Sequence, residues 1–174
     1  MPSLSPDSLL TWDAIDHDGC GAASGSALAA HGGALADETR FFTNCVLGIV
    51  PGHGYSIGAE LRFPTGQAET GFMWLGLTWY ASATECTGEQ FSNVTVYPVA
   101  TTATPGVWVR SNPNGLTAPT GAHSAAVNIL VNKETAGGVL LARFDGVYLV
   151  PVEWALQLDG FGTGSACRWS SIVP

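Results

Sequence analysis

The fold is decided by the stretch VPGHGYSIGAELRFPTG, which runs from Val50 to Gly66. From Tyr55 to Phe63, apolar side chains alternate with glycine, serine or charged residues, and this period of two is typical of a strand with one buried face. Pro64-Thr65-Gly66 then ends the pattern with a turn. A second stretch, Met73 to Trp79, alternates in the same way. We therefore expect two strands in which odd-numbered side chains face a core and even-numbered ones face away.

Short alternating or apolar runs also fill the rest of the chain, between clusters of glycine, proline and asparagine. Helical periodicity is nearly absent, and only residues 34–40 suit one helical turn. The predicted strands are 26–30, 41–50, 54–63, 70–81, 91–98, 105–111, 123–132, 139–149 and 152–158. Such a series of short strands predicts an all-β sandwich or barrel with little or no helix, and 174 residues favour one domain.

The charge of the chain argues against two classes of partner. The net charge is -8, from 6 Lys and Arg against 14 Asp and Glu. Nucleic acids and anionic membrane surfaces are bound through many basic side chains, so we expect neither as a partner. No apolar run approaches the roughly 20 residues of a membrane span. The first residues lack the basic and apolar regions of a secretory signal, so we expect this sequence to be a mature or shortened form if the protein is exported.

The four cysteines, at positions 20, 45, 86 and 167, lie far apart and form no Cys-x-x-Cys pair. An even number without metal-binding spacing favours disulfides in an oxidising compartment over free thiols. Cys45 precedes the first of the two strands above and Cys86 follows the second, so we expect their disulfide to join adjacent strands. A bond between Cys20 and Cys167 would then tie together the two ends of the chain.

The order of motifs along the chain resembles a known family. The residues that carry the resemblance are, in order, Asn44-Cys45-Val46, Pro51-Gly52-His53-Gly54-Tyr55, Trp79-Tyr80, Cys86-Thr87-Gly88, Trp108, Ala118-Pro119-Thr120-Gly121-Ala122 and Phe144-Asp145-Gly146-Val147-Tyr148-Leu149. Together they resemble the carbohydrate-binding-module-like (galactose-binding-like) jelly rolls of secreted bacterial proteins. The resemblance covers Trp12 to Val150 and implies a jelly-roll β-sandwich that binds glycans on a concave sheet face. We therefore divide the chain into an N-terminal extension (1–11), the sandwich (12–150) and a C-terminal tail (151–174).

Both ends of the chain depart from that family. Its members open with a strand before the first tryptophan, whereas here eleven residues precede Trp12, and Pro2 and Pro6 are among them. We expect this first strand to be missing or weak. The tail carries alternating apolar residues at 152, 154, 156 and 158, which suit an extra strand. That strand would fill the gap in its own sheet or in the sheet of a neighbouring molecule.

Strand parity predicts a glycan-binding face. If the odd-numbered residues face the core, Glu60, Arg62, Trp74 and Tyr80 face away from it, and a further strand adds Asn128. Aromatic rings stack on sugar rings, and planar polar groups bind sugar hydroxyls. We expect Trp74 and Tyr80 to stack on a glycan, and Glu60, Arg62 and Asn128 to hydrogen-bond to it. The alternative is that Trp74 and Tyr80 lie beneath a loop, the tail or a partner subunit.

The acidic stretch from Asp13 to Gly19 is a candidate calcium site, because carboxylates are the hard oxygen ligands that Ca²⁺ prefers. The resemblance implies one structural calcium with a ligand at Asp145. We expect Asp16, Asp18 and Asp145 to hold it, and we expect no other cofactor. The alternative is a solvated turn in which the aspartates cap backbone N–H groups.

We expect no enzymatic activity. Gly54-Tyr55-Ser56-Ile57-Gly58 matches the nucleophile elbow of hydrolases, but that motif requires a strand, a turn and a helix, and no helical sequence follows it here. The leading function is a non-catalytic carbohydrate-binding module, secreted by a bacterium, that recognises an extracellular glycan. The alternative is a structural subunit of an extracellular filament or surface assembly, in which copies associate by exchange of terminal strands.

Overall fold

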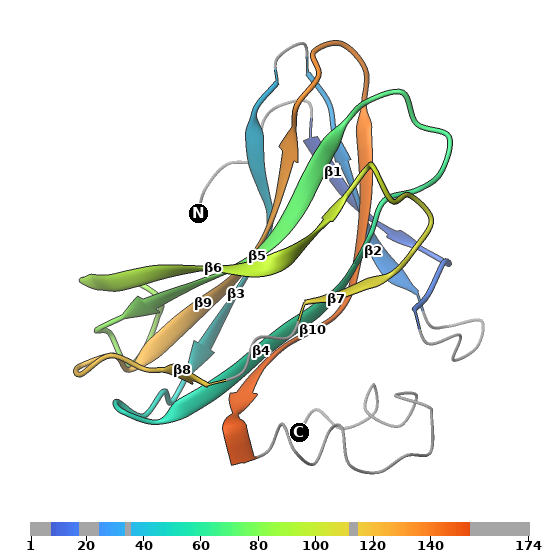
Figure 1. Ribbon diagram of the computed structural model, residues 1–174. Helices are drawn as coiled ribbons and strands as arrows, with labels where there is room; N and C mark the ends of the chain where they lie inside the picture. The colour runs from blue at the N-terminus through green and yellow to red at the C-terminus, as the bar shows by residue number, and fades with distance from the viewer. Residues whose placement is uncertain (1–7, 18–24, 34–35, 112–114, 154–174) are drawn as a thin grey trace.

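The computed structural model describes residues 8–17, 25–33, 36–111 and 115–153, which form two antiparallel sheets (Figure 1). The first, here called the β4 sheet, has the strand order β1-β2-β10-β4-β7, and β8 also pairs with β4. Its strands are β1 (Ser8–Asp13), β2 (Ser26–His31), β10 (Leu140–Pro151), β4 (Gly54–Arg62), β7 (Val109–Ser111) and β8 (Leu116–Thr117). The second, the β5 sheet, consists of β3 (Glu38–Leu47), β9 (Ser124–Lys133), β5 (Gly71–Tyr80) and β6 (Gln90–Thr101), in the order β3-β9-β5-β6.

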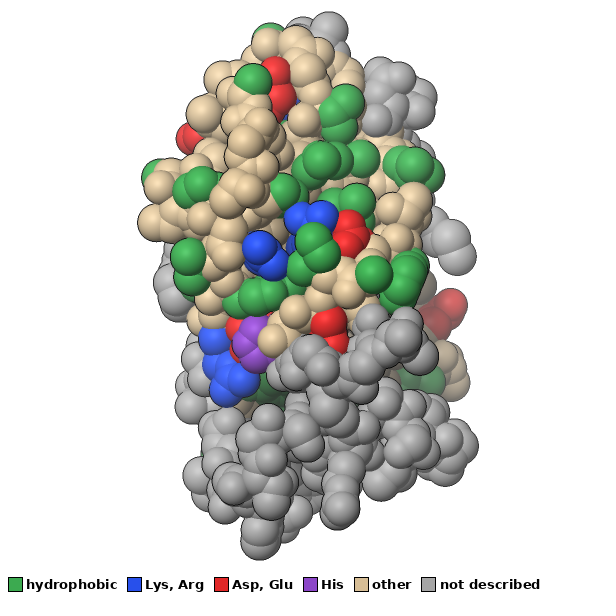
Figure 2. All heavy atoms as spheres, turned by 90° about the vertical axis from the view of Figure 1, so that its right-hand side faces the viewer, with side chains coloured by type: hydrophobic (Ala, Val, Ile, Leu, Met, Phe, Trp, Pro, Cys, Tyr) green, Lys and Arg blue, Asp and Glu red, His purple; other side chains and the backbone are tan. Residues whose placement is uncertain are grey.

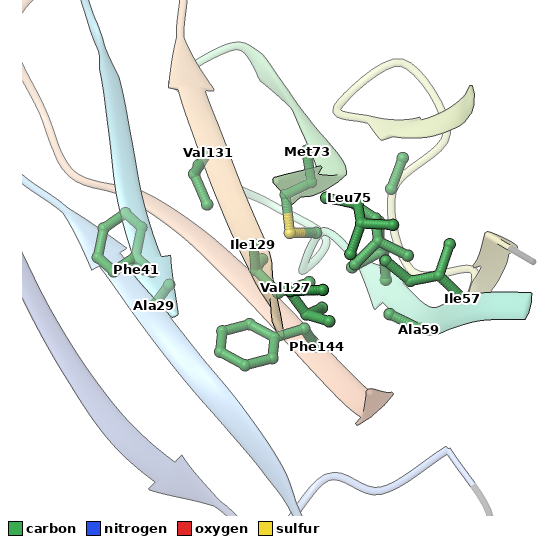
Figure 3. Packing of buried hydrophobic residues seen from close by; sticks show 14 of the residues in the cluster. Ala29, Phe41, Ile57, Ala59, Met73, Leu75, Val127, Ile129, Val131 and Phe144 are labelled. Atoms are coloured by element: carbon green, nitrogen blue, oxygen red, sulfur yellow. The ribbon is translucent and has the colours of Figure 1, made fainter. Parts of the chain in front are cut away.

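A single hydrophobic core lies between the two sheets (Figure 3). Odd-numbered residues of β4, β5 and β9 point into it, including Ile57, Leu61, Met73, Leu75, Leu77, Trp79, Val127, Ile129 and Val131. The ring of Tyr55 meets that of Trp79 edge-on at 5.7 Å between centroids. Full burial of each such aliphatic side chain contributes about 1.5–3 kcal/mol, so the alternating pattern supplies most of the drive to pair the two sheets.

The prediction of an all-β sandwich is confirmed. Among the described residues, helical backbone occurs only at Val152 and Glu153, directly after β10. No helix among the described residues is long and apolar enough to cross a membrane. The range 34–40 suited a helical turn in the sequence. Instead, residues 38–40 form the start of β3, which begins at Glu38.

β4 and β5, which the disulfide prediction treated as adjacent strands, lie in different sheets. Although the two strands follow one another along the chain, β4 pairs with β10, β7 and β8, whereas β5 pairs with β9 and β6. The segment 63–70 between them therefore crosses from one sheet to the other instead of making a hairpin. Both strands keep their odd-numbered side chains in the core, because the core lies between the sheets and each sheet presents one face to it.

The first strand is present, against expectation. β1 begins at Ser8, after the two prolines, and pairs with β2 over its whole length, from Ser8 opposite His31 to Asp13 opposite Ser26. It thereby occupies the edge of the β4 sheet that was expected to be vacant, and Leu10 packs against the core. Because Val152 and Glu153 are helical, the predicted tail strand does not begin at 152, and its remainder, 154–158, lies outside the described residues.

A disulfide joins Cys45 to Cys86, with 5.7 Å between the Cα atoms. Cys45 lies within β3, opposite Ala126 of β9, and Cys86 lies in the loop between β5 and β6. The bond therefore joins β3 to that loop across β9, rather than joining two adjacent strands as expected. Cys20 and Cys167 lie outside the described residues.

Candidate functional site

The five residues predicted to bind a glycan lie on opposite sides of the molecule. Trp74, Tyr80 and Asn128 belong to the β5 sheet, whereas Glu60 and Arg62 belong to the β4 sheet. All five have the outward parity that alternation predicted, because their odd-numbered neighbours fill the core. The prediction that they form one site is therefore wrong: outward residues of two packed sheets face away from each other.

The outer face of the β5 sheet, called the β5 face, is ordered in rows across β3, β9 and β5. Its outward residues are Glu38, Arg40, Thr43, Cys45 and Leu47 of β3, Ser124, Ala126, Asn128, Leu130 and Asn132 of β9, and Phe72, Trp74, Gly76, Thr78 and Tyr80 of β5. Small and polar side chains occupy the middle rows, where Thr43, Asn128 and Gly76 lie side by side. Aromatic side chains lie at both ends of β5 on this face.

The outward aromatic side chains of β5 lie in two groups along the strand. Phe72 and Trp74 meet edge-on, with 5.8 Å between ring centroids and 78° between the ring planes. Tyr80 lies six residues after Trp74 on the same strand, a separation of roughly 20 Å at the usual rise of a β-strand. Its hydroxyl accepts a long hydrogen bond from the side-chain amide of Gln90, at 3.5 Å. Rings at this spacing suit separate sugar units of one chain.

The surface between Trp74 and Tyr80 carries polar side chains. Asn128 is 2% exposed, and its Oδ1 accepts a hydrogen bond of 3.0 Å from the hydroxyl of Thr43. Its Nδ2 donates to the carbonyl of Ala126 at 3.3 Å, so the amide is held in place on both sides. Thr43 is exposed, and its oxygen keeps lone pairs that can accept a hydrogen bond from a ligand. Asn128 therefore orients Thr43, which the sequence had not indicated as a site residue.

A hollow of about 680 Å³ lies beyond Phe72, at one end of the β5 face. It is lined by Thr70, Gly71, Phe72, Thr101, Thr102, Ala103 and Glu134. Two hydrogen bonds connect the segments that line it. The N–H of Glu134 donates to the carbonyl of Thr70 at 2.9 Å. The hydroxyl oxygen of Thr102 accepts from the N–H of Gly71 at 3.0 Å. The size suits a small ligand group.

The outer face of the β4 sheet, the β4 face, holds the other two predicted residues in a network of charges. The carboxylate of Glu60, whose side chain is 9% exposed, accepts a hydrogen bond from Nε of Arg110 at 2.5 Å. His17 approaches the second oxygen at 3.6 Å and meets the ring of Trp108 edge-on. The guanidinium of Arg62 lies over Trp108, 5.8 Å from the ring centroid. Glu60 and Arg62 thus serve contacts within the protein.

The side of the molecule where Figure 1 places β1 and β2 is the one seen in Figure 2, where acidic, basic and histidine side chains lie among hydrophobic ones. Arg143 and Asp13 form an ion pair between β10 and β1, with 2.8 Å from Nη2 to Oδ2. The hydrogen bond from Arg143 lowers the pKa of Asp13, and the backbone N–H of Ile15 adds to this effect. The charges of the β4 face are therefore largely matched in pairs.

Two of the three predicted calcium ligands lie close together. Burial raises the pKa of Asp145, and a hydrogen bond with Asp16 raises it further. Oδ2 of Asp145 accepts from the N–H of His17 at 3.3 Å, and Oδ1 accepts from the N–H of Gly146 at 2.7 Å. Two adjacent carboxyl groups fit the donor chemistry of a hard cation. Asp18 lies outside the described residues, which contain no group of three metal-ligating side chains.

The sequence that resembles a hydrolase elbow is an ordinary strand. Ser56 lies inside β4, is 1% exposed, and is followed by six further residues of the same strand. A nucleophile elbow needs a sharp turn that exposes the serine, so this serine does not have that geometry.

Comparisons with solved structures find β-sandwiches. The C-terminal family 22 carbohydrate-binding module of Clostridium thermocellum Xyn10B superposes with a TM-score of 0.55 at 16% identity, over 84% of this chain and 83% of the module. An arabinose-bound α-L-arabinofuranosidase, MgGH51, gives a TM-score of 0.58 at 18% identity, over 86% of this chain but 23% of the enzyme. The active domain of tailspike protein 4 from bacteriophage CBA120 gives 0.52 at 14% identity, over 84% of this chain and 20% of that one.

No protein-family model matches the chain, and no curated protein sequence matches it. The similarity covers about a quarter or less of the length of each of the two enzymes, whereas it covers most of the Xyn10B module. At these identities the likeness concerns architecture. The chain has the β-sandwich fold of carbohydrate-binding modules.

Proposed function

We propose that this protein is a non-catalytic glycan-binding module whose ligand lies along the β5 face. The observation that carries the proposal is the arrangement of β5: Phe72 and Trp74 stand at one end, Tyr80 at the other, and small or polar residues lie between them. A sugar chain is long and has both C–H-rich faces and hydroxyl edges. It therefore needs separated aromatic platforms with hydrogen-bonding groups between them, which is what this face offers.

Each residue of the face has a role in this proposal. Trp74 and Tyr80 stack on sugar rings, and Phe72 supports Trp74 through their edge-on contact. Thr43 accepts a hydrogen bond from a sugar hydroxyl, while Asn128 holds Thr43 in place. Glu60 and Arg62 have no part in it, because they lie on the β4 sheet. The fold supports a ligand-binding role, since the structurally similar Xyn10B module has a cleft concerned with ligand binding.

An extracellular setting, secreted by a bacterium, belongs to the same proposal. The Cys45–Cys86 disulfide supports it, because such bonds persist mainly in oxidising compartments. The low proportion of charged residues, 11%, fits a surface that relies on threonine, serine and glycine for solubility.

The direct test is binding of the purified chain to a glycan array, followed by calorimetric titration of the best ligand. Trp74→Ala should weaken binding at least ten-fold, about 1.4 kcal/mol, because a buried tryptophan contact is commonly among the strongest in an interface. The matched control is Trp108→Ala, which removes the same side chain from the β4 face and should leave the affinity unchanged.

Two results would reject this use of the β5 face. One is the absence of any retained glycan. The other is an equal loss in Trp74→Ala and Trp108→Ala, which would indicate that both substitutions act on stability. Melting curves of both variants separate that case from a loss of contact.

A second candidate function, a subunit of an extracellular assembly, is favoured by one observation. β1 is an edge strand of the β4 sheet, and two of its large apolar side chains, Leu9 and Trp12, are 59% and 61% exposed. Exposed apolar edge strands pair readily with strands of other molecules. Because β1 already occupies the sheet edge, this candidate requires pairing along β1 rather than filling of a gap by the tail. Measurement of the particle mass in solution tests it.

A further inference from the structure

The hollow beyond Phe72 continues the β5 face. Phe72 is an outward residue of β5. Thr70, just before β5, and Glu134, just after β9, are even-numbered like the outward residues of those two strands. Thr101 lies opposite Phe72 on β6. A glycan that follows the column Tyr80, Trp74 and Phe72 would therefore place its next unit in this hollow.

The charges around the hollow are negative. Glu134 lines it, and Glu38 lies at the same end of the sheet, opposite Asn132, which in turn is opposite Phe72. Both glutamates are exposed. Glu69 also lies at this end, but its carboxylate accepts hydrogen bonds from the Thr135 hydroxyl and the Gly138 N–H. Glu134 is therefore the charged residue that lines the hollow.

Most cations of the described part of the chain lie on the β4 face or are held by backbone carbonyls. Arg62 stacks on Trp108, Arg110 pairs with Glu60, Arg143 pairs with Asp13, and the ammonium of Lys133 donates to the carbonyls of Gly33 and Gly138. Arg40 is the cation on the β5 face, in the row of Leu130 and Trp74 and thus away from the hollow. Lys133 lies next to Glu134 and opposite Gly71, but its side chain is 1% exposed and its ammonium is held by those two carbonyls. Among the described residues, Glu134 is therefore the exposed charged side chain that lines the hollow, and it would repel a negatively charged sugar unit there.

We propose that this hollow is a terminal subsite for a sugar unit that carries a protonated amine, with Glu134 as its counter-ion. The inference rests on the proposed glycan-binding function and names the chemistry of one unit of the ligand. The ring of the sugar packs against Phe72, its hydroxyls meet the threonines that line the hollow, and its amine faces the Glu134 carboxylate. Uronic acids are disfavoured at this position.

The test compares two β-1,4-linked hexamers, one of glucosamine and one of glucose, which differ only in an amine or a hydroxyl at the second carbon. Wild-type protein should bind the glucosamine hexamer about two- to five-fold more tightly at low salt, the range expected of an exposed ion pair. Because salt screens such a pair, the preference should shrink as the ionic strength rises.

Glu134→Gln should abolish the preference and leave the affinity for the glucose hexamer unchanged. The matched control is Glu153→Gln, which removes the same charge from an exposed residue directly after β10 of the β4 sheet and should keep the preference. Both variants have the same net charge, so a difference between them reports position.

Three results would overturn the subsite: equal binding of both hexamers by the wild type, equal effects of Glu134→Gln and Glu153→Gln, or a Glu134→Gln loss that is the same for both hexamers. These leave the glycan-binding function standing, since the glucose hexamer is still bound and Trp74→Ala still weakens it. Binding of neither hexamer would overturn the subsite, and the glycan array together with Trp74→Ala then decides separately whether the function fails too.

Discussion

Trp74 and Trp79 show that a residue's position in a strand determines whether its side chain lies in the core or on the outer face. Trp79 is 1% exposed and fills the core, whereas Trp74 points outward, five positions earlier in the same strand. Alternation of the sequence predicted this difference, because successive side chains of a strand point to opposite sides. It predicted the side of each residue correctly on β4 as well.

Other residues of the site could not be found so directly. Phe72 has the same parity as Trp74, so extending the alternating pattern by two residues would have indicated it. Thr43 is different: an irregularity in the pairing of β3 with β9, between Arg40 and Phe42, shifts the parity of β3. Such a bulge depends on the partner strand and leaves no periodic signal in the sequence.

At the residue scale, the ion pair of Asp13 and Arg143 predicts a pH-dependent stability. The pKa of Asp13 is lowered in the folded protein from its ordinary value of 3.8, mainly by the hydrogen bond from Arg143. The pair therefore stabilises the fold above that value, and its contribution is lost as the pH falls through the lowered pKa. Asp13→Asn should reduce the free energy of unfolding by roughly 1 kcal/mol at neutral pH, and the two proteins should converge in strong acid.

The substitution isolates the charge, because asparagine keeps an oxygen that can accept the hydrogen bond from the N–H of Ile15, now 2.8 Å from Oδ1. Denaturant titrations from neutral to acidic pH measure the difference. Glu89→Gln, at an exposed site, serves as the reference for a change of net charge alone. A difference between Asp13→Asn and wild type that does not vary with pH would contradict this account.

At the scale of the elements, the sequence indicated most strands but not their partners. β4 and β5 have nearly the same alternating pattern, and that pattern is satisfied equally by a hairpin in one sheet or by one strand in each of two packed sheets. The choice is made by long-range pairing: β4 with β10 and β5 with β9, segments far away in the sequence. For this reason the predicted site combined residues of two faces.

The disulfide between Cys45 and Cys86 predicts a stability effect at this scale. It closes a loop with a sequence separation of 41 residues, which restricts the unfolded chain. In the chain-entropy model this contributes about 4 kcal/mol. The double variant Cys45→Ser with Cys86→Ser should therefore lower the free energy of unfolding by about 2–4 kcal/mol, as measured by denaturant titration without reductant.

The same bond holds the loop 81–89 beside the Tyr80 end of the β5 face. The carbonyl of Glu85 accepts a hydrogen bond of 2.9 Å from the Ser124 hydroxyl, and Ala81 donates to the carbonyl of Glu89 at 3.0 Å. These contacts remain in the double variant, so strands β5 and β9 should keep their pairing, visible as an unchanged far-ultraviolet spectrum. An unfolding free energy equal to that of the wild type would reject the stabilising role.

At the scale of the whole molecule, the two outer faces differ in character. The β4 face pairs its charges within the protein, whereas the β5 face carries the partly exposed aromatic side chains of Phe72, Trp74 and Tyr80. Because the faces point in opposite directions, a molecule that associates with copies of itself along the edge of the β4 sheet keeps its β5 face open. The two candidate functions are therefore compatible in space.

Association along β1 predicts a particle larger than the chain mass of 18.0 kDa in sedimentation at micromolar concentration. Leu9→Lys should return the protein to a monomer, because a lysine on an edge strand opposes pairing with another strand. The control is Val107→Lys, since Val107 is 58% exposed, close to the 59% of Leu9, and lies in the segment before β7. If wild type and both variants sediment alike as monomers, β1 does not join copies, and the exposed Leu9 and Trp12 belong to an ordinary sheet edge.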